Sequence, residues 1–254
     1  MQFFCDQINK MKKLLLVQPG AYGDIFVCAP IAKWYADKGY EVHWPVREQF
    51  IPTLEYFDYV KPIILSDESL HSDWLRSDVM KILPMFDGYD KVLNLADRGP
   101  HSPAQRFNEN FELCKYRLAE VPFDEKNKLS WTRNYDKELS LFNFLELTED
   151  EPYVVAHNTD SRNEVATIPD VNYKIVEVKP IDGYNIPDWY LVFQKAKELY
   201  CIESSVHQFL DGVVFNLSRD RYLLKRPVVE TGHRFTVSTN WKLDFIGKES
   251  VIKG

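Results

Sequence analysis

A βαβ unit near the start of the chain constrains the fold more than any other feature of the sequence. The apolar run at 14–17 predicts a buried parallel strand, which ends at Pro19-Gly20. Gly23 directly precedes Asp24, a helical pattern follows, and residues 41–46 predict the next strand. In α/β sheets, ligands bind at the carboxyl ends of the strands, where the first loop of such a unit lies. Asp24 is therefore an acid at the mouth of a predicted site.

The glycine-bearing loop differs from the known nucleotide fingerprints. A dinucleotide site needs G-x-G-x-x-G, whereas the loop at 20–24 reads G-A-Y-G-D, and it lacks the G-K-[ST] of a phosphate loop. The unit thus predicts an α/β fold that uses neither NAD nor ATP as a cofactor.

Composition narrows the class of protein. The chain has 254 residues, enough for one large or two small domains, and a net charge of -7, which disfavours non-specific nucleic-acid binding outside a local basic patch. No apolar stretch is long enough to span a bilayer, and the first ten residues lack the apolar region of a signal peptide. The four cysteines, Cys5, Cys28, Cys114 and Cys201, lie far apart without a C-x-x-C pair. Cys28 and Cys201 fall in predicted helix or strand segments and are expected to be buried thiols, and a reduced cytoplasmic setting is the simple inference.

Strand and helix patterns alternate through both halves of the chain, which predicts two α/β layers joined by a crossing. Residues 11–135 form the predicted N-terminal Rossmann-like domain and residues 136–254 a smaller C-terminal one, whose last ~25 residues are expected to pack back on the first. The polar stretch at 124–136 predicts the crossing, and 139–147 is a short helix or strand. Further strands are predicted at 59–65, 91–95, 151–158, 173–180 and 199–203, and helices at 47–57, 72–83, from 104, from 186 and from 204.

A second motif, CIESSVHQFLD, occupies residues 201–211. A strand ends at Ile202, and the next helix presents free N–H groups and the positive end of its dipole to the sheet edge. The segment Glu203-Ser204-Ser205 is either a cradle for a diphosphate, with His207 as a second donor, or an ordinary helix cap with His207 packed on the sheet. Asp24 carries the same ambiguity, because aspartate is also a favoured cap for the helix predicted at 25–38.

These two motifs, in this order, resemble those of the bacterial heptosyltransferases, glycosyltransferase family 9. The opening stretch LLLVQPGAYGDIFVCAPIAKWYADKGYEVHW carries the Gly23-Asp24 pair and the early helix proline, Pro30. The stretch GYNIPDWYLVFQKAKELYCIESSVHQFLDG matches the donor half, although Glu203-Ser204-Ser205 stands where the family usually has Asp-Thr-Gly. The resemblance extends from Met11 to about Arg226.

The resemblance implies a GT-B fold, in which two Rossmann-like domains face each other across a cleft. It also implies a metal-independent, inverting transfer of a sugar from a nucleotide-diphosphate donor to an acceptor hydroxyl, with Asp24 as general base. Neither a metal nor a further cofactor is expected, and the partners are a nucleotide sugar and a glycan or other hydroxyl acceptor. The candidate donor-binding residues are Glu203, Ser204, Ser205, His207, Arg162, Asn158, Glu177 and Tyr184, and the acceptor-binding ones are Gly20, Tyr22, Gly23, Arg98 and Arg106.

Two alternatives remain open. Compact GT-B enzymes of phages glycosylate hydroxymethylated bases in DNA, and the basic stretch from Arg98 to Arg117, which includes Lys115, suits such an acceptor if it lines the cleft. The same stretch also fits a solvated helix face. The second alternative is a non-catalytic nucleotide-sugar-binding protein, which the altered Glu-Ser-Ser turn favours and the retained Gly-Asp pair opposes.

Overall fold

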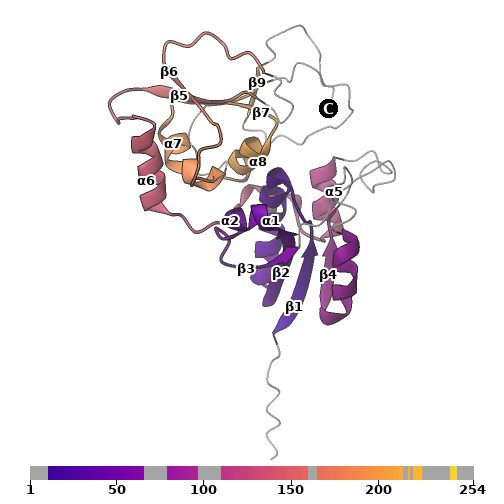
Figure 1. Cartoon of the computed structure of the whole chain (residues 1–254). Coiled ribbons are helices and arrows are strands. Elements are labelled where there is room, and N and C mark those ends of the chain that lie inside the picture. Colours follow the sequence, from indigo (N-terminus) through magenta and orange to yellow (C-terminus); the bar gives the residue numbers. More distant parts are fainter. Residues whose placement is uncertain are drawn as a thin grey trace, which may run out of the picture.

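The protein was analysed as a computed structural model that describes residues 11–65, 79–96, 110–159, 165–213, 217, 220–224 and 241–244. These residues form two parallel β-sheets, each flanked by helices and stacked end to end in Figure 1. The fold is α/β with two Rossmann-like domains, as the sequence predicts.

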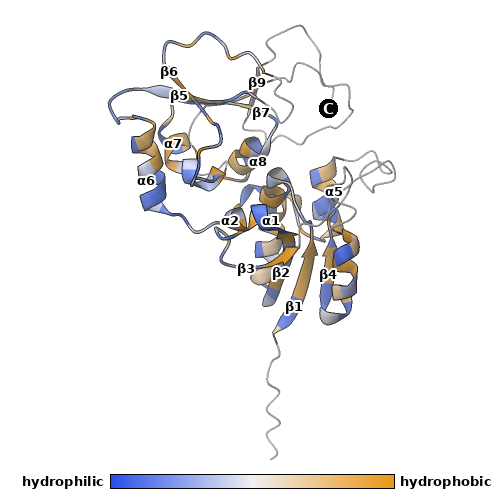
Figure 2. Cartoon of the chain, in the orientation of Figure 1, coloured by the Kyte–Doolittle hydropathy of each residue, from blue (hydrophilic) through white to orange (hydrophobic). Residues whose placement is uncertain are grey.

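The first sheet has the strand order β3-β2-β1-β4, and all of its pairs are parallel. Its central strand is apolar because it is covered on both faces: residues 14–17 are fully buried, and Figure 2 shows most of β1 in the colour of hydrophobic residues. The elements of this half are β1 (Lys12–Val17), α1 (Tyr22–Ala36), β2 (Tyr40–Arg47), η1 (Glu48–Phe50), α2 (Ile51–Leu54), β3 (Val60–Leu65), η2 (Leu83–Gly88), β4 (Lys91–Asn94), α5 (Phe111–Leu118) and η3 (Phe123–Asn127).

The second sheet has the order β6-β5-β7-β8-β9, again parallel throughout. With five described strands against four, it is not the smaller of the two sheets. The segment at 139–147, left open between helix and strand, lies mostly in a helix. The elements are α6 (Tyr135–Phe144), β5 (Tyr153–His157), β6 (Lys174–Glu177), η4 (Ile186–Trp189), α7 (Tyr190–Lys195), β7 (Glu198–Ile202), α8 (Ser205–Gly212), β8 (Asp220–Leu224) and β9 (Lys242–Asp244).

The described residues at the C-terminal end belong to the second sheet. Residues 242–244 form β9 and pair with β8. Trp241, just before them, is buried against the second domain and donates a hydrogen bond to Asp211. The physical reason is the open edge of β8, whose unpaired backbone groups a further parallel strand satisfies.

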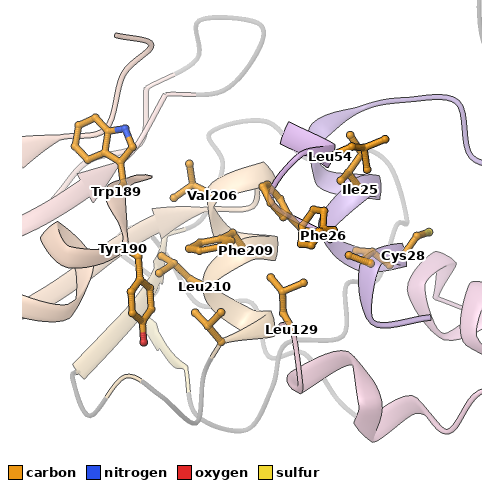
Figure 3. Close-up of a cluster of buried hydrophobic side chains, with 14 of the residues drawn as sticks. Ile25, Phe26, Cys28, Leu54, Leu129, Trp189, Tyr190, Val206, Phe209 and Leu210 are labelled. Carbon is orange, nitrogen blue, oxygen red and sulfur yellow. The ribbon is translucent and has the colours of Figure 1, made fainter. Parts of the chain in front are cut away.

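An aromatic contact between α1 and α8 joins the two halves. The rings of Phe26 and Phe209 meet at a centroid distance of 5.2 Å, and Trp131, from the crossing segment, lies against Phe209 at the same distance. Figure 3 shows Phe26 and Phe209 pointing toward each other, with Leu129 beside them. One buried cluster contains Phe26, Phe209 and Leu129, with partly buried Trp131 packed against it, so this hydrophobic core runs through both sheets.

A buried ionic cluster lies beside this core. The Lys126 ammonium is 2.6 Å from the carboxylates of both Glu112 and Asp211, and the Gln208 amide donates to Glu112. Burial lowers the pKa of Lys126, but attraction to the two carboxylates outweighs that effect and raises it, whereas burial raises the pKa of Glu112. Because Lys126 and Glu112 belong to the first half and Asp211 and Gln208 to α8, the cluster fixes α8 against the first domain.

The buried thiols expected at Cys28 and Cys201 are confirmed. Both are free and buried, as is Cys114, and burial raises the pKa of Cys28 and Cys201 to about 12. Cys5, like most of the helix predicted at 72–83, lies outside the described residues.

The contact between Gly212 and Leu129 gives a test of this interface. A Cβ at position 212 would lie 2.8 Å from the Cβ of Leu129, so Gly212→Ala forces the two halves apart. We expect the free energy of unfolding to fall by about 1–3 kcal/mol in urea denaturation.

Gly88→Ala is the matched control, because a Cβ there meets nothing within 4 Å. The double variant Leu129→Gly/Gly212→Ala, which removes the Cβ that the new methyl group meets, should lose less stability than the sum of its single changes. Wild-type stability in Gly212→Ala would contradict the described packing of α8 on Leu129.

Candidate functional site

The loop between β1 and α1 is held tightly in place. The buried Gln18 side chain donates to the carbonyl of Gly20, and the Gln18 carbonyl accepts from the indole of Trp44. Ala21, the residue before the helix, has φ +59°, a value that an L-residue adopts only at a cost of about 1–3 kcal/mol. Strain of this kind is concentrated at functional loops, where the surrounding structure maintains it.

Asp24 is the third residue of α1 and does not cap it. The N-cap position is Ala21, and no side chain makes the capping bond. The alternative reading of Asp24 as a cap is therefore wrong, because the helix starts three residues earlier than the pattern indicated. The carboxylate lies in the first turn, where the helix dipole favours negative charge, and its side chain is 11% exposed.

Lys115 is the cation that faces Asp24. Its ammonium lies 3.4 Å from the Asp24 carboxylate and donates to the Gln18 side chain at 2.8 Å and to the carbonyl of Leu95. The Lys115 side chain is only 2% exposed, so it belongs to the site and not to a basic surface. Arg117, from the same stretch, is exposed, while Arg98 and Arg106 lie outside the described residues.

On the other side of the site, Ser204 is the N-cap of α8. Its hydroxyl accepts from the His207 backbone N–H at 3.3 Å, and it is hydrogen-bonded to the Ile202 carbonyl and the His157 ring, each at 3.1 Å. The capping function predicted for this turn is therefore present. It leaves the backbone N–H groups of Ser205 and Val206 as the first donors of the helix.

The structure brings the two sequence motifs together. A Cβ built on Gly23 would lie 3.7 Å from the Ser205 Cα and 3.9 Å from the Ser205 nitrogen. The N-terminal ends of α1 and α8 thus touch through a residue without a side chain, and Figure 1 shows the two helices adjacent where the domains meet. Two positive helix ends, a carboxylate and a buried lysine share this one place.

His207 lies in the first turn of α8, two residues after Ser205. Its ring is fully buried at a centroid distance of 4.8 Å from Trp241, and within the described part of the chain neither ring nitrogen has a hydrogen-bond partner. Burial is the largest effect on its pKa and lowers it to about 4, while the Asp211 carboxylate raises it and Lys126 lowers it further. The imidazole is accordingly neutral at pH 7, so it contributes at most a hydrogen bond and no charge.

The other donor-side candidates lie along the carboxyl edge of the second sheet or beyond it. Asn158, after β5, donates to the carbonyl of Ala166 and closes its own loop. Glu177 is exposed at the end of β6. Tyr184 is hydrogen-bonded through its hydroxyl to Ser140 on α6 and packs near Phe144, so it is a structural contact between α6 and the loop before η4. Glu203 is half-buried, and Arg162 falls outside the described residues.

On the first domain, Tyr22 is exposed beside Asp24. Its hydroxyl donates to the carbonyl of Gln49, and its ring meets the edge of Phe50 at 4.9 Å. Gly20 is buried, with its carbonyl engaged by Gln18. Sequence reasoning missed the roles of Gln18, Lys115 and His157, because each depends on a partner distant in sequence.

Within the described ranges, no cluster of three or more His, Cys, Asp or Glu side chains is arranged to hold a metal ion. The helices described there also include none with the length and apolar character needed to cross a bilayer.

Buried His207 predicts a specific pH dependence of stability. With a folded pKa of about 4 against an ordinary value of 6.5, the folded protein binds fewer protons than the unfolded chain in this window. The free energy of unfolding therefore decreases as pH falls from about 6.5 to 4, and His207 contributes about 3 kcal/mol to that decrease. Urea denaturation of His207→Phe across that range should show a shallower loss than wild type, and parallel curves would contradict the assignment.

Comparison with known proteins supports the fold. No protein-family model matches the sequence, and no curated protein sequence matches it significantly. Among solved structures, a family 9 glycosyltransferase from Veillonella parvula matches with a TM-score of 0.54 at 12% identity, covering 83% of this chain and 80% of its own. The ADP-heptose lipopolysaccharide heptosyltransferase II of Escherichia coli matches with a TM-score of 0.52 at 11% identity, covering 84% of each chain. At these identities the matches establish a shared architecture: this chain has the two-domain GT-B fold seen in family 9 glycosyltransferases.

Proposed function

We propose that this protein is a metal-independent, inverting glycosyltransferase that moves a sugar from a nucleotide-diphosphate donor to an acceptor hydroxyl. The observation that carries the proposal is the contact between Gly23 and Ser205, which sets Asp24 beside the N-terminal end of α8. A carboxylate and a set of anion-binding amides are the two groups that such a transfer requires.

Asp24 acts as the general base in this proposal. Its carboxylate accepts the proton of the acceptor hydroxyl as that oxygen attacks the anomeric carbon, and the bond from that carbon to the diphosphate oxygen breaks on the opposite face. One displacement inverts the anomeric configuration. Lys115, 3.4 Å from one carboxylate oxygen, holds the side chain in place from the buried side.

The leaving diphosphate rests on α8. The first-turn N–H groups of Ser205 and Val206 donate to its oxygens, and the helix dipole stabilises the charge that develops there. Ser204 supports this arrangement indirectly, since its hydroxyl occupies the His207 N–H and fixes the helix start.

A thermal-shift screen of nucleoside-diphosphate sugars identifies the donor, because a ligand that binds only the folded state raises its stability. With that donor, Asp24→Asn should lower transfer by about 100- to 10,000-fold, since the amide cannot accept the proton. Asp37→Asn is the matched control: it changes an exposed aspartate at the other end of α1, paired with Lys33. Full transfer by Asp24→Asn would remove this residue from the chemistry, and donor binding without any transfer in wild type would favour the non-catalytic alternative.

The role of the α8 amides is tested at Ser205. Proline is tolerated at the first position of a helix, and the extended backbone of Ser204 suits a residue before proline. Ser205→Pro therefore removes one N–H while keeping the helix. We expect the donor dissociation constant to rise about 10- to 100-fold, the loss of one hydrogen bond to a charged group.

Ser205→Ala removes the hydroxyl and keeps the N–H, so calorimetric titration should give a donor affinity close to wild type. Equal weakening in both variants would assign the interaction to the hydroxyl and not to the backbone.

A further inference from the structure

A cavity lies where the crossing segment passes between the two domains. Its volume is about 570 Å³, within the range of ~300–1,000 Å³ typical of small-molecule sites. It opens between α2, the start of α6 and the loop before η4. The lining residues are Pro52, Glu55, Tyr56, Thr132, Arg133, Asn134, Tyr135, Asp136, Lys137 and Asn185.

Hydrogen bonds between the domains hold the walls of this cavity in place. The hydroxyl of Tyr56, in the turn after α2, donates to the buried Asp188 carboxylate of η4. The Thr132 N–H donates to the Tyr56 carbonyl at 2.7 Å, and the Asn134 side chain caps α6. The site is therefore preformed, and an occupant would touch both domains and the segment that joins them.

The charges around the cavity disfavour an anionic ligand. Arg133 donates through two nitrogens to the buried carboxylate of Glu138, and the Lys137 ammonium lies 3.9 Å from Asp188. Both cations are thus engaged by buried acids, whereas the exposed carboxylates of Glu55 and Asp136 add negative charge to the rim. A phosphate, whether of a nucleotide or of DNA, meets repulsion here.

The shape and chemistry of the lining suit a sugar ring. Tyr135 is 66% exposed, with the Arg133 guanidinium 4.4 Å from its ring centre, and presents an aromatic surface beside the cavity. A pyranose packs the C–H groups of one face on such a ring and donates its hydroxyls to acceptors at its edge. The Glu55 and Asp136 carboxylates are such acceptors.

We propose that this cavity binds a neutral saccharide unit, and that it is a remote subsite for a glycan acceptor. The role as an acceptor subsite rests on the proposed function. It is supported by Tyr22, which lies two residues before Asp24. The Tyr22 hydroxyl and ring contact Gln49 and Phe50, and these two residues directly precede α2, the helix beside the cavity. An acceptor with several sugar units can then hold one unit here while another reacts near Asp24, a mode of binding that DNA cannot use.

Saturation-transfer NMR with methyl glycosides of glucose, galactose, mannose and N-acetylglucosamine tests the site directly on the full chain. We expect at least one glycoside to bind, and Tyr135→Ala and Glu55→Gln each to weaken that binding about tenfold. Tyr173→Ala is the matched control, because Tyr173 is an exposed tyrosine on the surface near β6 and does not line the cavity.

Binding of none of the four glycosides would overturn the proposal, as would equal binding by Tyr135→Ala and wild type. Tight binding of inorganic phosphate or spermidine in their place, lost in the same variants, would assign the cavity to a charged ligand and overturn it too. Because the readout is binding, the two proposals fail separately: glycoside binding without any sugar transfer removes the proposed function alone, and transfer without glycoside binding removes this subsite alone.

Discussion

The packing of α1 on α8 is the constraint on which the rest of the molecule depends. Phe26 and Phe209 make the two helices part of one apolar core, and Gly23 lets their first turns touch. Lys126 adds a buried ionic contact that both domains share. Breaking such a pair leaves uncompensated buried charge, so the relative position of the two helix ends is strongly specified.

This packing has an electrostatic consequence. Two helix N-termini meet at one place, and each carries partial positive charge on its free N–H groups. Buried Lys115 adds a full positive charge nearby, while Asp24 supplies a negative one. The site therefore combines an anion-binding surface with a carboxylate, although the chain as a whole has a net charge of -7. The proposed placement of a diphosphate on α8 and a hydroxyl beside Asp24 is based on these two features.

Local patterns were enough to predict β1 to β7 and the two loops that meet at the site, whereas β8 and β9 were missed. The apolar run at 14–17 specifies a central strand because only a strand covered on both faces is apolar throughout. The burial of charged residues was harder to predict. Lys115 has the sequence pattern of a solvated helix face, but it is buried against Gln18 and Asp24, which lie more than ninety positions earlier. Asp24 was left open between a cap and a catalytic acid. The cap alternative was wrong, because the strained backbone of Ala21 starts the helix early and sequence alone gives no sign of that strain.

The Glu203-Ser204-Ser205 turn shows how the chain accommodates a departure from the family pattern. A glycine in this turn would give a phosphate close access to the backbone, and the chain has a serine there instead. The glycine lies across the contact, at Gly23, whose missing side chain leaves space over the Ser205 nitrogen. Meanwhile the Ser204 hydroxyl, fixed by His157 and Ile202, holds the helix start in one geometry. The contact between the two helix ends is thus made by one residue from each domain, so neither domain forms it alone.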